Sequence, residues 1–322
     1  MVQRLVTDQI WREALHRLRS VNSAELSARI ARLRRADFNI MTEAQIRERL
    51  GRLMDGYSTK TVSLVTNQIY RARKNNGNQS FENTTELWYP PAVVVQPGRF
   101  NRAGQSVFYS SNTMNAALWE IRPAEGDKVT VAICRSVERV LAITCVHIGL
   151  YLYQGKAPAV GGVPDLRSDT HFITGLQTEK VDRKWTKIDA LLAELVTGDE
   201  KPRPNLYAAT RQIGTTLLGV GTAEGLIYPS VAAGLAAFNL RLEPSVADEK
   251  LTIGEVWEFE IIKHIDHLEG RPRSKPGYVL TRPVRRSEKI NSDGSIQWMD
   301  RFERGAAIDF STIQGRLDSI RK

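Results

Sequence analysis

Residues 98–121 (GRFNRAGQSVFYSSNTMNAALWEI) bring an arginine, a tyrosine and a glutamate close together in the chain. Arg99 stands in a loop next to a proline and a glycine, where its guanidinium can approach a ligand. Arginine is the best planar, two-pronged partner for a phosphate. Tyr109 offers a flat ring with a polar tip, which suits stacking on a heterocycle. Glu120 shares a helix face with two alanines, which leave room beside its carboxylate.

These three side chains together suit attack at the ribose carbon that bears nicotinamide in NAD⁺. The leaving group already carries positive charge, so no acid is needed to expel it, and the sugar becomes oxocarbenium-like. A fixed carboxylate stabilises that cation mainly in the transition state, which is where stabilisation accelerates the reaction. The residues alone leave a plain alternative open, in which Arg99 and Glu120 form a salt bridge between a loop and a helix.

The elements around these residues alternate between strands and helices. Tyr109 ends a predicted strand (SVFYSS), and Glu120 lies in a predicted helix (TMNAALWEI) capped by Asn112 or Thr113. Further strands are predicted in IYRAR, VVVQPG, DKVTVAICRSV, LAITCVHI, GLIYPS, EVWEFEII and GYVLTRPV, and helices at about residues 184–197 and 205–219. The pattern predicts an α+β domain with a mixed β core and flanking helices. Long loops at about residues 74–98 and 154–180 indicate a binding face.

The first 56 residues are predicted to be helical. Helix starts with a capping box are predicted at Asn22, with Glu25 three residues on, and at Thr42, with Gln45 three residues on; Gly56 is the predicted stop. The apolar stripes are narrow and need a covering surface, either the main domain or a partner. The first stripe is formed by Ile10, Trp11, Ala14, Leu15 and Leu18. We therefore divide the chain into a helical extension, residues 1–62, and a main domain, residues 63–322.

The composition, with 42% hydrophobic and 25% charged residues, is that of a soluble globular protein. No apolar run approaches the roughly 20 residues that cross a bilayer, and the N-terminus lacks the apolar core of a secretory signal. We therefore expect a cytoplasmic protein that does not bind a membrane. Cys134 and Cys145 are expected to be reduced core residues. The net charge of +9 would suit nucleic acid, a phosphate-bearing molecule or an acidic partner, or a merely solvated surface.

Motifs of other chemistries are missing from the sequence. It has no phosphate loop, no nucleophile elbow, no H-E-x-x-H and no paired C-x-x-C. The segment GVGTAEG resembles a dinucleotide fingerprint, but its spacing is wrong and it precedes a strand. His264 and His267 could touch a metal, yet two histidines without a further Cys/His cluster are typical of a surface turn. We expect no metal.

Four motifs, IYRAR, ELWYPP, residues 98–121 and EGLIYPSVAAGLAAFNLRL, together resemble the RES-domain family from about residue 69 to residue 242. The family pattern begins with a Gly-Arg-aromatic-Asn loop, a glycine and a strand that ends in tyrosine. A helix with alanine and glutamate follows, and then a late Gly-Ile-x-Tyr-Pro-Ser. Here the pattern is matched by residues 98–101, Gly104, Tyr109, Ala117 with Glu120, and residues 225–230.

The resemblance implies an ADP-ribosyltransferase-like fold with a cleft for NAD⁺, and degradation of NAD⁺ by hydrolysis, or by phosphorolysis with inorganic phosphate as co-substrate. It implies that Glu120 is the catalytic carboxylate and that Tyr109 packs on the nicotinamide side. Arg71 and Arg99 would hold the dinucleotide, with Asn101 and Ser230 also in the binding site and Arg102 as a second choice for the phosphate. The plain alternatives are a solvent-facing strand arginine for Arg71 and a hydroxyl bonded to backbone for Ser230.

Many members of the family are toxins held inactive by a cognate antitoxin, so the resemblance implies such a partner. It does not explain the helical extension or an insertion at residues 150–205. The extension could regulate, form a homo-oligomer or bind a partner. Direct nucleic-acid binding is not expected, because the extension lacks interleaved aromatics. Two other functions stay open: an ADP-ribosyltransferase that modifies a macromolecule, and a non-enzymatic module that binds nucleic acid or a partner.

Overall fold

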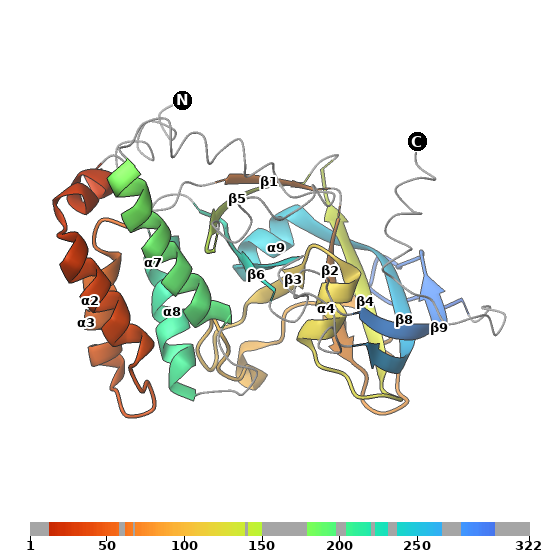
Figure 1. Ribbon diagram of the computed structural model, residues 1–322. Coiled ribbons are helices and arrows are strands. Elements are labelled where there is room, and N and C mark those ends of the chain that lie inside the picture. Colours follow the sequence, from red (N-terminus) through yellow and green to blue (C-terminus); the bar gives the residue numbers. More distant parts are fainter. Residues whose placement is uncertain are drawn as a thin grey trace. The chain divides into compact units, whose positions relative to one another are not determined.

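The structure, a computed structural model, describes residues 13–57, 62–66, 68–138, 141–149, 179–197, 204–219, 223–230, 237–265 and 278–299 (Figure 1). Contacts within the chain divide it into two compact units. Unit 1 comprises Met1–Val65, Pro91–Gln105 and Ala142–Pro229; unit 2 comprises Thr66–Pro90, Ser106–Leu141 and Ser230–Lys322. Over these described ranges, no helix combines the length and the apolar character needed to cross a membrane.

Helices dominate unit 1. Residues 13–20 are helical and are followed by α2 (Ser23–Arg34) and α3 (Glu43–Met54), with α7 (Glu179–Thr197) and α8 (Pro204–Leu218) later in the chain. Helix α2 contacts α7, and α3 contacts α8, as Figure 1 shows for the red and green helices. The apolar stripes of α2 and α3 are buried, at Leu26, Ile30, Leu33, Ile46, Leu50, Leu53 and Met54. The surface that covers the N-terminal helices is therefore supplied by α7 and α8 of the same chain.

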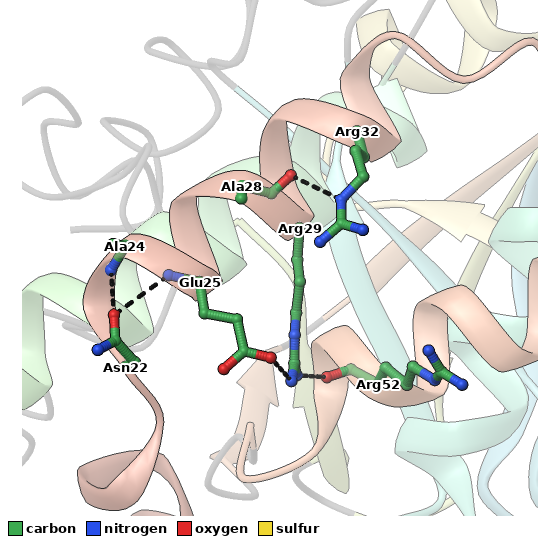
Figure 2. A network of polar contacts seen from close by, with 7 residues as sticks. All are labelled: Asn22, Ala24, Glu25, Ala28, Arg29, Arg32 and Arg52. Carbon is green, nitrogen blue, oxygen red and sulfur yellow. Dashed lines mark hydrogen bonds and ion pairs between the residues drawn. The ribbon is translucent and has the colours of Figure 1, made fainter.

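The cap of α2 agrees with the prediction at Asn22 and differs at Glu25 (Figure 2). Asn22 Oδ1 accepts hydrogen bonds from the backbone N–H groups of Ala24, at 2.8 Å, and of Glu25, at 3.3 Å. The Glu25 carboxylate pairs with Arg29, one turn on, at 2.5 Å, because a charged partner competes well with a backbone N–H. Arg29 also donates to the carbonyl of Arg52 at 2.6 Å and so joins α2 to the last turn of α3.

Helix α3 begins and ends as predicted. The Thr42 side chain accepts from Gln45 N, and Gln45 Oε1 accepts from Thr42 N, which completes the capping box. The helix ends at Met54, and Gly56 follows with φ of +81°. A Cβ at position 56 would lie 2.7 Å from the backbone nitrogen of Leu18, so both the dihedral angle and the space favour glycine there.

Unit 1 also contains three strands in the spatial order β1 (Val62–Thr66), β5 (Leu141–His147) and β6 (Gly225–Pro229); the end residues Thr66 and Leu141 belong to unit 2. Strands β5 and β6 run parallel, with Cys145 opposite Gly225. Strand β1 was not predicted.

Unit 2 is built on antiparallel strands. Their spatial order is β7 (Phe238–Leu242), β3 (Phe108–Ser111), β2 (Gln68–Lys74), β4 (Lys128–Ser136), β8 (Leu251–Ile265) and β9 (Tyr278–Ser287). Helix α4 (Met114–Glu120) packs on one face, and α9 (Pro244–Lys250) joins β7 to β8. With parallel pairing in unit 1 and antiparallel pairing in unit 2, the predicted α+β class with mixed β structure is confirmed.

Several local predictions were wrong. The segment VVVQPG was predicted as a strand but contains none: its first two valines belong to the short 3₁₀ helix η2 (Ala92–Val94), and Pro97 lacks the backbone donor that a strand needs. The cap of α4, predicted as Asn112 or Thr113, is confirmed at Thr113, and Asn112 Oδ1 accepts from Phe238 N instead. Strand β7 and helix α9 were missed. Residues 154–178 of the predicted long loop, and residues 10 and 11 of the first stripe, lie outside the described residues. The domain boundary after residue 62 stays a prediction.

Both cysteines are free and buried, as expected from the sequence. Burial raises the pKa of the Cys134 thiol to about 12, and the nearby Arg71 opposes that shift. Cys134 is therefore a thiol at neutral pH.

Candidate functional site

Glu120 is the last residue of α4, and its carboxylate is held by two neutral donors. Ser230 Oγ donates to Glu120 Oε1 at 2.8 Å, and Asn239 Nδ2 donates to the same oxygen at 2.7 Å. Both donors are buried, whereas Glu120 is exposed. Ser111 Oγ donates to Asn239 Oδ1 at 2.6 Å and so orients the amide that faces Glu120. Among the described residues, no contact reaches Oε2, so this oxygen is available to a ligand.

The strand register places further residues on the same face of the unit 2 sheet. Tyr70 lies opposite Ser111, Ser111 lies opposite Asn239, and Tyr109 lies opposite Arg241. Residues that are directly opposite in an antiparallel pair point to the same side. Tyr70 also belongs to the apolar cluster that α4 covers. Tyr109 and Arg241 therefore form the row next to Ser111 and Asn239, and Asn239 is the residue that binds Glu120.

Arg241 is a buried arginine, and two nitrogens of its guanidinium donate no hydrogen bond to the residues that the structure describes. Its side chain is 3% exposed and pairs with Glu243 at 2.6 Å. Within the part of the chain that the structure describes, its Nε and Nη1 have no hydrogen-bond partner. A buried cation with unused donors is well suited to an anionic group of a ligand.

Arg71 lies on the opposite face of the sheet from Glu120. Its guanidinium stands 5.4 Å from the centre of the Phe108 ring, and its Nε and Nη1 donate to the carbonyls of Leu87, at 3.0 Å, and Tyr109, at 2.7 Å. Burial, and then the neighbouring Arg73, lowers the pKa of Arg71 to about 10. Arg71 thus remains a cation at neutral pH, and two of its donors hold the backbone, one of them at Tyr109.

The ELWYPP motif contacts both strand β3 and helix α9 of unit 2. Trp88 Nε1 and the Tyr89 hydroxyl donate to the two carboxylate oxygens of Asp248, at 2.8 Å and 2.7 Å. This bond raises the pKa of the Tyr89 phenol. The Trp88 ring packs on Phe108, with ring centres 4.8 Å apart. The motif therefore fixes strand β3, which carries Tyr109, to helix α9.

Arg99 and Asn101 belong to unit 1, where Asn101 shapes the loop that carries Arg99. The buried Asn101 side chain donates to the carbonyls of Gln96, at 2.9 Å, and Arg102, at 3.0 Å. A Cβ at Gly98 would collide with Asn101 Oδ1, which explains the glycine. The Arg99 side chain is half-buried, and in the described ranges no hydrogen bond or ion pair involves its guanidinium. Arg99 is thus a cation that a ligand can engage, whereas Asn101 holds the loop.

The same loop is tied to α8 and β6 within unit 1. Thr210 Oγ1 donates to the carbonyl of Arg99. The ring of Phe100 meets Tyr228 edge-on, with centres 4.8 Å apart, and it occupies the space where a Cβ at Gly214 would lie. Two of the motifs noted in the sequence, GRFN and GLIYPS, therefore meet through Phe100 and Tyr228.

The structure thus brings Glu120 and Ser230 into direct contact and places Tyr109 in the adjacent row. Sequence reasoning missed Ser111, Asn239 and Arg241. The alternation of polar and apolar residues in FNLRL could have revealed a strand with Asn239 and Arg241 on one face.

The histidine pair that we considered for a metal is only partly described. His264 Nε2 lies 2.6 Å from the carbonyl oxygen of Pro123, and its ring meets Trp119 edge-on. His267 lies outside the described residues. In the described segments, no three His, Cys, Asp or Glu side chains are grouped so that they could hold a metal ion.

Comparison with known proteins gives the family. No curated protein matches the chain. The family model of the RES domain matches residues 68–261, a span that includes IYRAR, Arg99, Tyr109, Glu120, Ser230 and Asn239. This span covers more than half of the 322 residues. The chain therefore belongs to the RES domain family, a toxin-like, NAD-related family with an ADP-ribosyltransferase-like fold.

Proposed function

We propose that this protein cleaves the bond between nicotinamide and ribose in NAD⁺ and transfers the ADP-ribosyl group to water or to inorganic phosphate. The observation that carries this proposal is the Glu120 carboxylate, which Ser230 and Asn239 hold by one oxygen while the other stays available. A carboxylate fixed in this way needs little reorganisation when positive charge develops beside it.

In the proposed reaction, the bond between C1′ and the pyridinium nitrogen breaks and its electron pair leaves with nicotinamide. The ribose becomes an oxocarbenium-like cation, which Glu120 stabilises. An oxygen of water or phosphate then bonds to C1′, and the attacking water gives up a proton. Because the leaving nicotinamide is neutral, this proposal requires no metal.

The family resemblance assigns Tyr109 to the nicotinamide side of NAD⁺ and Arg99 to the diphosphate. Two other residues are assigned by their contacts. Ser230 acts through Glu120, and Asn101 acts through the Arg99 loop. Arg71 was expected to hold the dinucleotide; with two donors on backbone carbonyls, it positions Tyr109 in this proposal.

The proposal is tested by incubating the purified protein with NAD⁺ and following free nicotinamide, with and without phosphate. Glu120→Gln keeps the size of the side chain and removes its charge, so we expect turnover to fall roughly 10²–10³-fold. Glu125→Gln removes a charge at an exposed glutamate beyond α4 and serves as the matched control. Intact NAD⁺ under both conditions, or full turnover by Glu120→Gln, would contradict the proposal.

The products identify the acceptor. Free ADP-ribose indicates water, and its phosphate ester indicates phosphorolysis. Label from NAD⁺ that ends on protein or nucleic acid would indicate a macromolecular ADP-ribosyltransferase instead, because both reactions share the leaving group and differ only in what attacks.

We further propose that the protein acts as a bacterial toxin and is restrained by a cognate antitoxin. The toxin-like character of the family supports this. Expression of the intact chain should lower cellular NAD⁺ and stop growth, and Glu120→Gln should do neither. Growth arrest at unchanged NAD⁺ would instead favour a function other than NAD⁺ cleavage.

A further inference from the structure

A cavity in unit 1 has a volume of about 340 Å³ and is formed by three separate segments. Glu43 and Arg47 come from α3, Arg102 comes from the loop that also carries Arg99, and Arg211 with Thr215 comes from α8. No role in NAD⁺ cleavage has been assigned to α3 or α8, so the cavity needs its own explanation.

The charges around the cavity are unbalanced. Arg211 is largely buried, with 15% of its side chain exposed, and it pairs with Glu43 at 2.8 Å, whose side chain is 55% exposed. Arg47 and Arg102 are exposed, and no carboxylate in the described segments forms an ion pair with either of them. Three guanidinium groups thus line the cavity beside one carboxylate, which pairs only with Arg211 and is more than half exposed to solvent.

We propose that this cavity binds a small phosphate-bearing anion. The planar fork of a guanidinium matches phosphate oxygens in a two-pronged way, and three such groups on different segments can surround one phosphate or diphosphate. A volume of about 340 Å³ is in the range of small-molecule sites and suits a ligand of that size better than a peptide segment. Glu43 occupies Arg211 in the absence of the anion and competes with it.

A ligand in this cavity would also hold the loop that carries Arg99 against helix α8. Thr210, which precedes Arg211 on α8, donates to the Arg99 carbonyl. Arg102, which lines the cavity, belongs to the same loop, and its carbonyl accepts a hydrogen bond from the Asn101 side chain. An anion that joins Arg102 to Arg211 therefore adds a second tie between this loop and α8.

Isothermal titration of the full chain with pyrophosphate at low salt tests the proposal. Arg47→Ala and Arg211→Gln each remove one charged contact, so we expect each to weaken binding about ten-fold or more. Glu43→Gln removes the competitor while preserving the shape, so binding should tighten. Opposite signs at Glu43 and Arg47, on the same helix, are not expected of a merely structural ion pair.

Arg52→Ala is the matched control. Arg52 also lies on α3, but it pairs with Glu48 at 2.6 Å and does not line the cavity, so this variant should bind pyrophosphate as the wild type does. Circular dichroism confirms that the variants are folded. No binding to the wild type, or equal affinities for Arg47→Ala and Arg52→Ala, would overturn the proposal.

Inorganic phosphate and AMP distinguish the sources of the ligand. Binding of AMP alongside pyrophosphate assigns the cavity to a nucleotide phosphate, and binding of inorganic phosphate without AMP assigns it to free phosphate. Repeating the titration with Arg99→Ala separates this site from the proposed NAD⁺ site, because Arg99 grips the diphosphate there and does not line the cavity, so the cavity should bind pyrophosphate equally well in that variant.

Discussion

At the scale of single residues, the most informative arrangement is the pair of donors on one oxygen of Glu120. Ser230 directly follows strand β6, Asn239 lies in strand β7, and both donate to Oε1 of Glu120. Their effect on Glu120 is orientation: they fix which oxygen faces the protein and which faces a ligand.

We therefore expect Ser230→Ala and Asn239→Ala each to lower kcat about ten-fold, with little change in KM, because each removes one bond to the carboxylate. Steady-state kinetics of nicotinamide release provide the measurement. Ser110→Ala is the matched control: Ser110 is buried on the opposite face of β3, and its hydroxyl has no partner among the described residues. A wild-type kcat in both site variants would show that the two donors do not matter.

A second prediction concerns His147, which is buried at the end of β5. Burial lowers its pKa to about 4. The unfolded chain takes up this proton near pH 6.5 and the folded chain only near pH 4, so protons favour unfolding. The contribution of His147 to stability should be complete above about pH 6.5 and fall by up to about 3 kcal/mol as pH drops to about 4.

Urea unfolding between pH 4 and pH 7 measures this effect. His147→Gln should flatten the pH dependence of the unfolding free energy in that interval. His16→Gln, at an exposed histidine in unit 1, should keep the wild-type profile. Identical profiles for His147→Gln and the wild type would refute the assignment.

At the scale of elements, the N-terminal helices are fastened to α7 by a buried lysine. Lys184 is 3% exposed, and its ammonium donates to the carbonyls of Leu18, at 3.1 Å, of Arg19, at 3.0 Å, and of Val21. These carbonyls end the helix of residues 13–20, where a cation is favoured by the helix dipole. A single side chain thus caps one helix from another.

Lys184→Met should destabilise the protein by roughly 1–3 kcal/mol, because the buried carbonyls lose their donor. Lys187→Met, one turn away on α7, removes an exposed lysine that contacts Ser27 Oγ at 3.3 Å, so it should change the unfolding free energy by much less. Thermal unfolding compares the two variants. Equal losses would show that the carbonyls find other partners.

Elements whose ends are marked by neighbouring residues in the sequence were predictable. Elements that depend on pairing with residues far away in the sequence were not. Helix α3 could be predicted in full, because Thr42, Gln45 and Gly56 mark its ends within the sequence. The candidate site was predicted only in part. Asn239 reaches Glu120 through the register of β7 against β3, and a pairing between residues more than a hundred positions apart leaves no local pattern in one sequence. The alternation of side chains along the strand predicts the face of the sheet on which Arg71 lies. It does not predict the hydrogen bonds of Arg71 to two backbone carbonyls.

At the scale of the whole molecule, the two units are interleaved in sequence. Each unit takes three segments of the chain, and the N-terminal helices share unit 1 with α7 and α8. The helical extension therefore does more than precede the main domain, since it covers apolar surface on helices that come more than a hundred residues later.

A chain that starts at residue 62 tests this arrangement. Without α2 and α3, the facing surfaces of α7 and α8 lose apolar partners that contribute about 1.5–3 kcal/mol for each fully buried large side chain. We expect this shorter chain to unfold at a lower temperature and to aggregate in size-exclusion chromatography. An unchanged melting temperature would mean that residues 62–322 fold independently of the extension.

The distance in sequence between Glu120 and its two donors has a consequence for synthesis on the ribosome. Glu120 is translated 110 residues before Ser230 and 119 residues before Asn239. A nascent or prematurely terminated polypeptide that ends between them carries the acid without either of the groups that aim it. Incomplete translation products should therefore be inert, and activity should emerge only after the ribosome has passed the strand that contains Asn239.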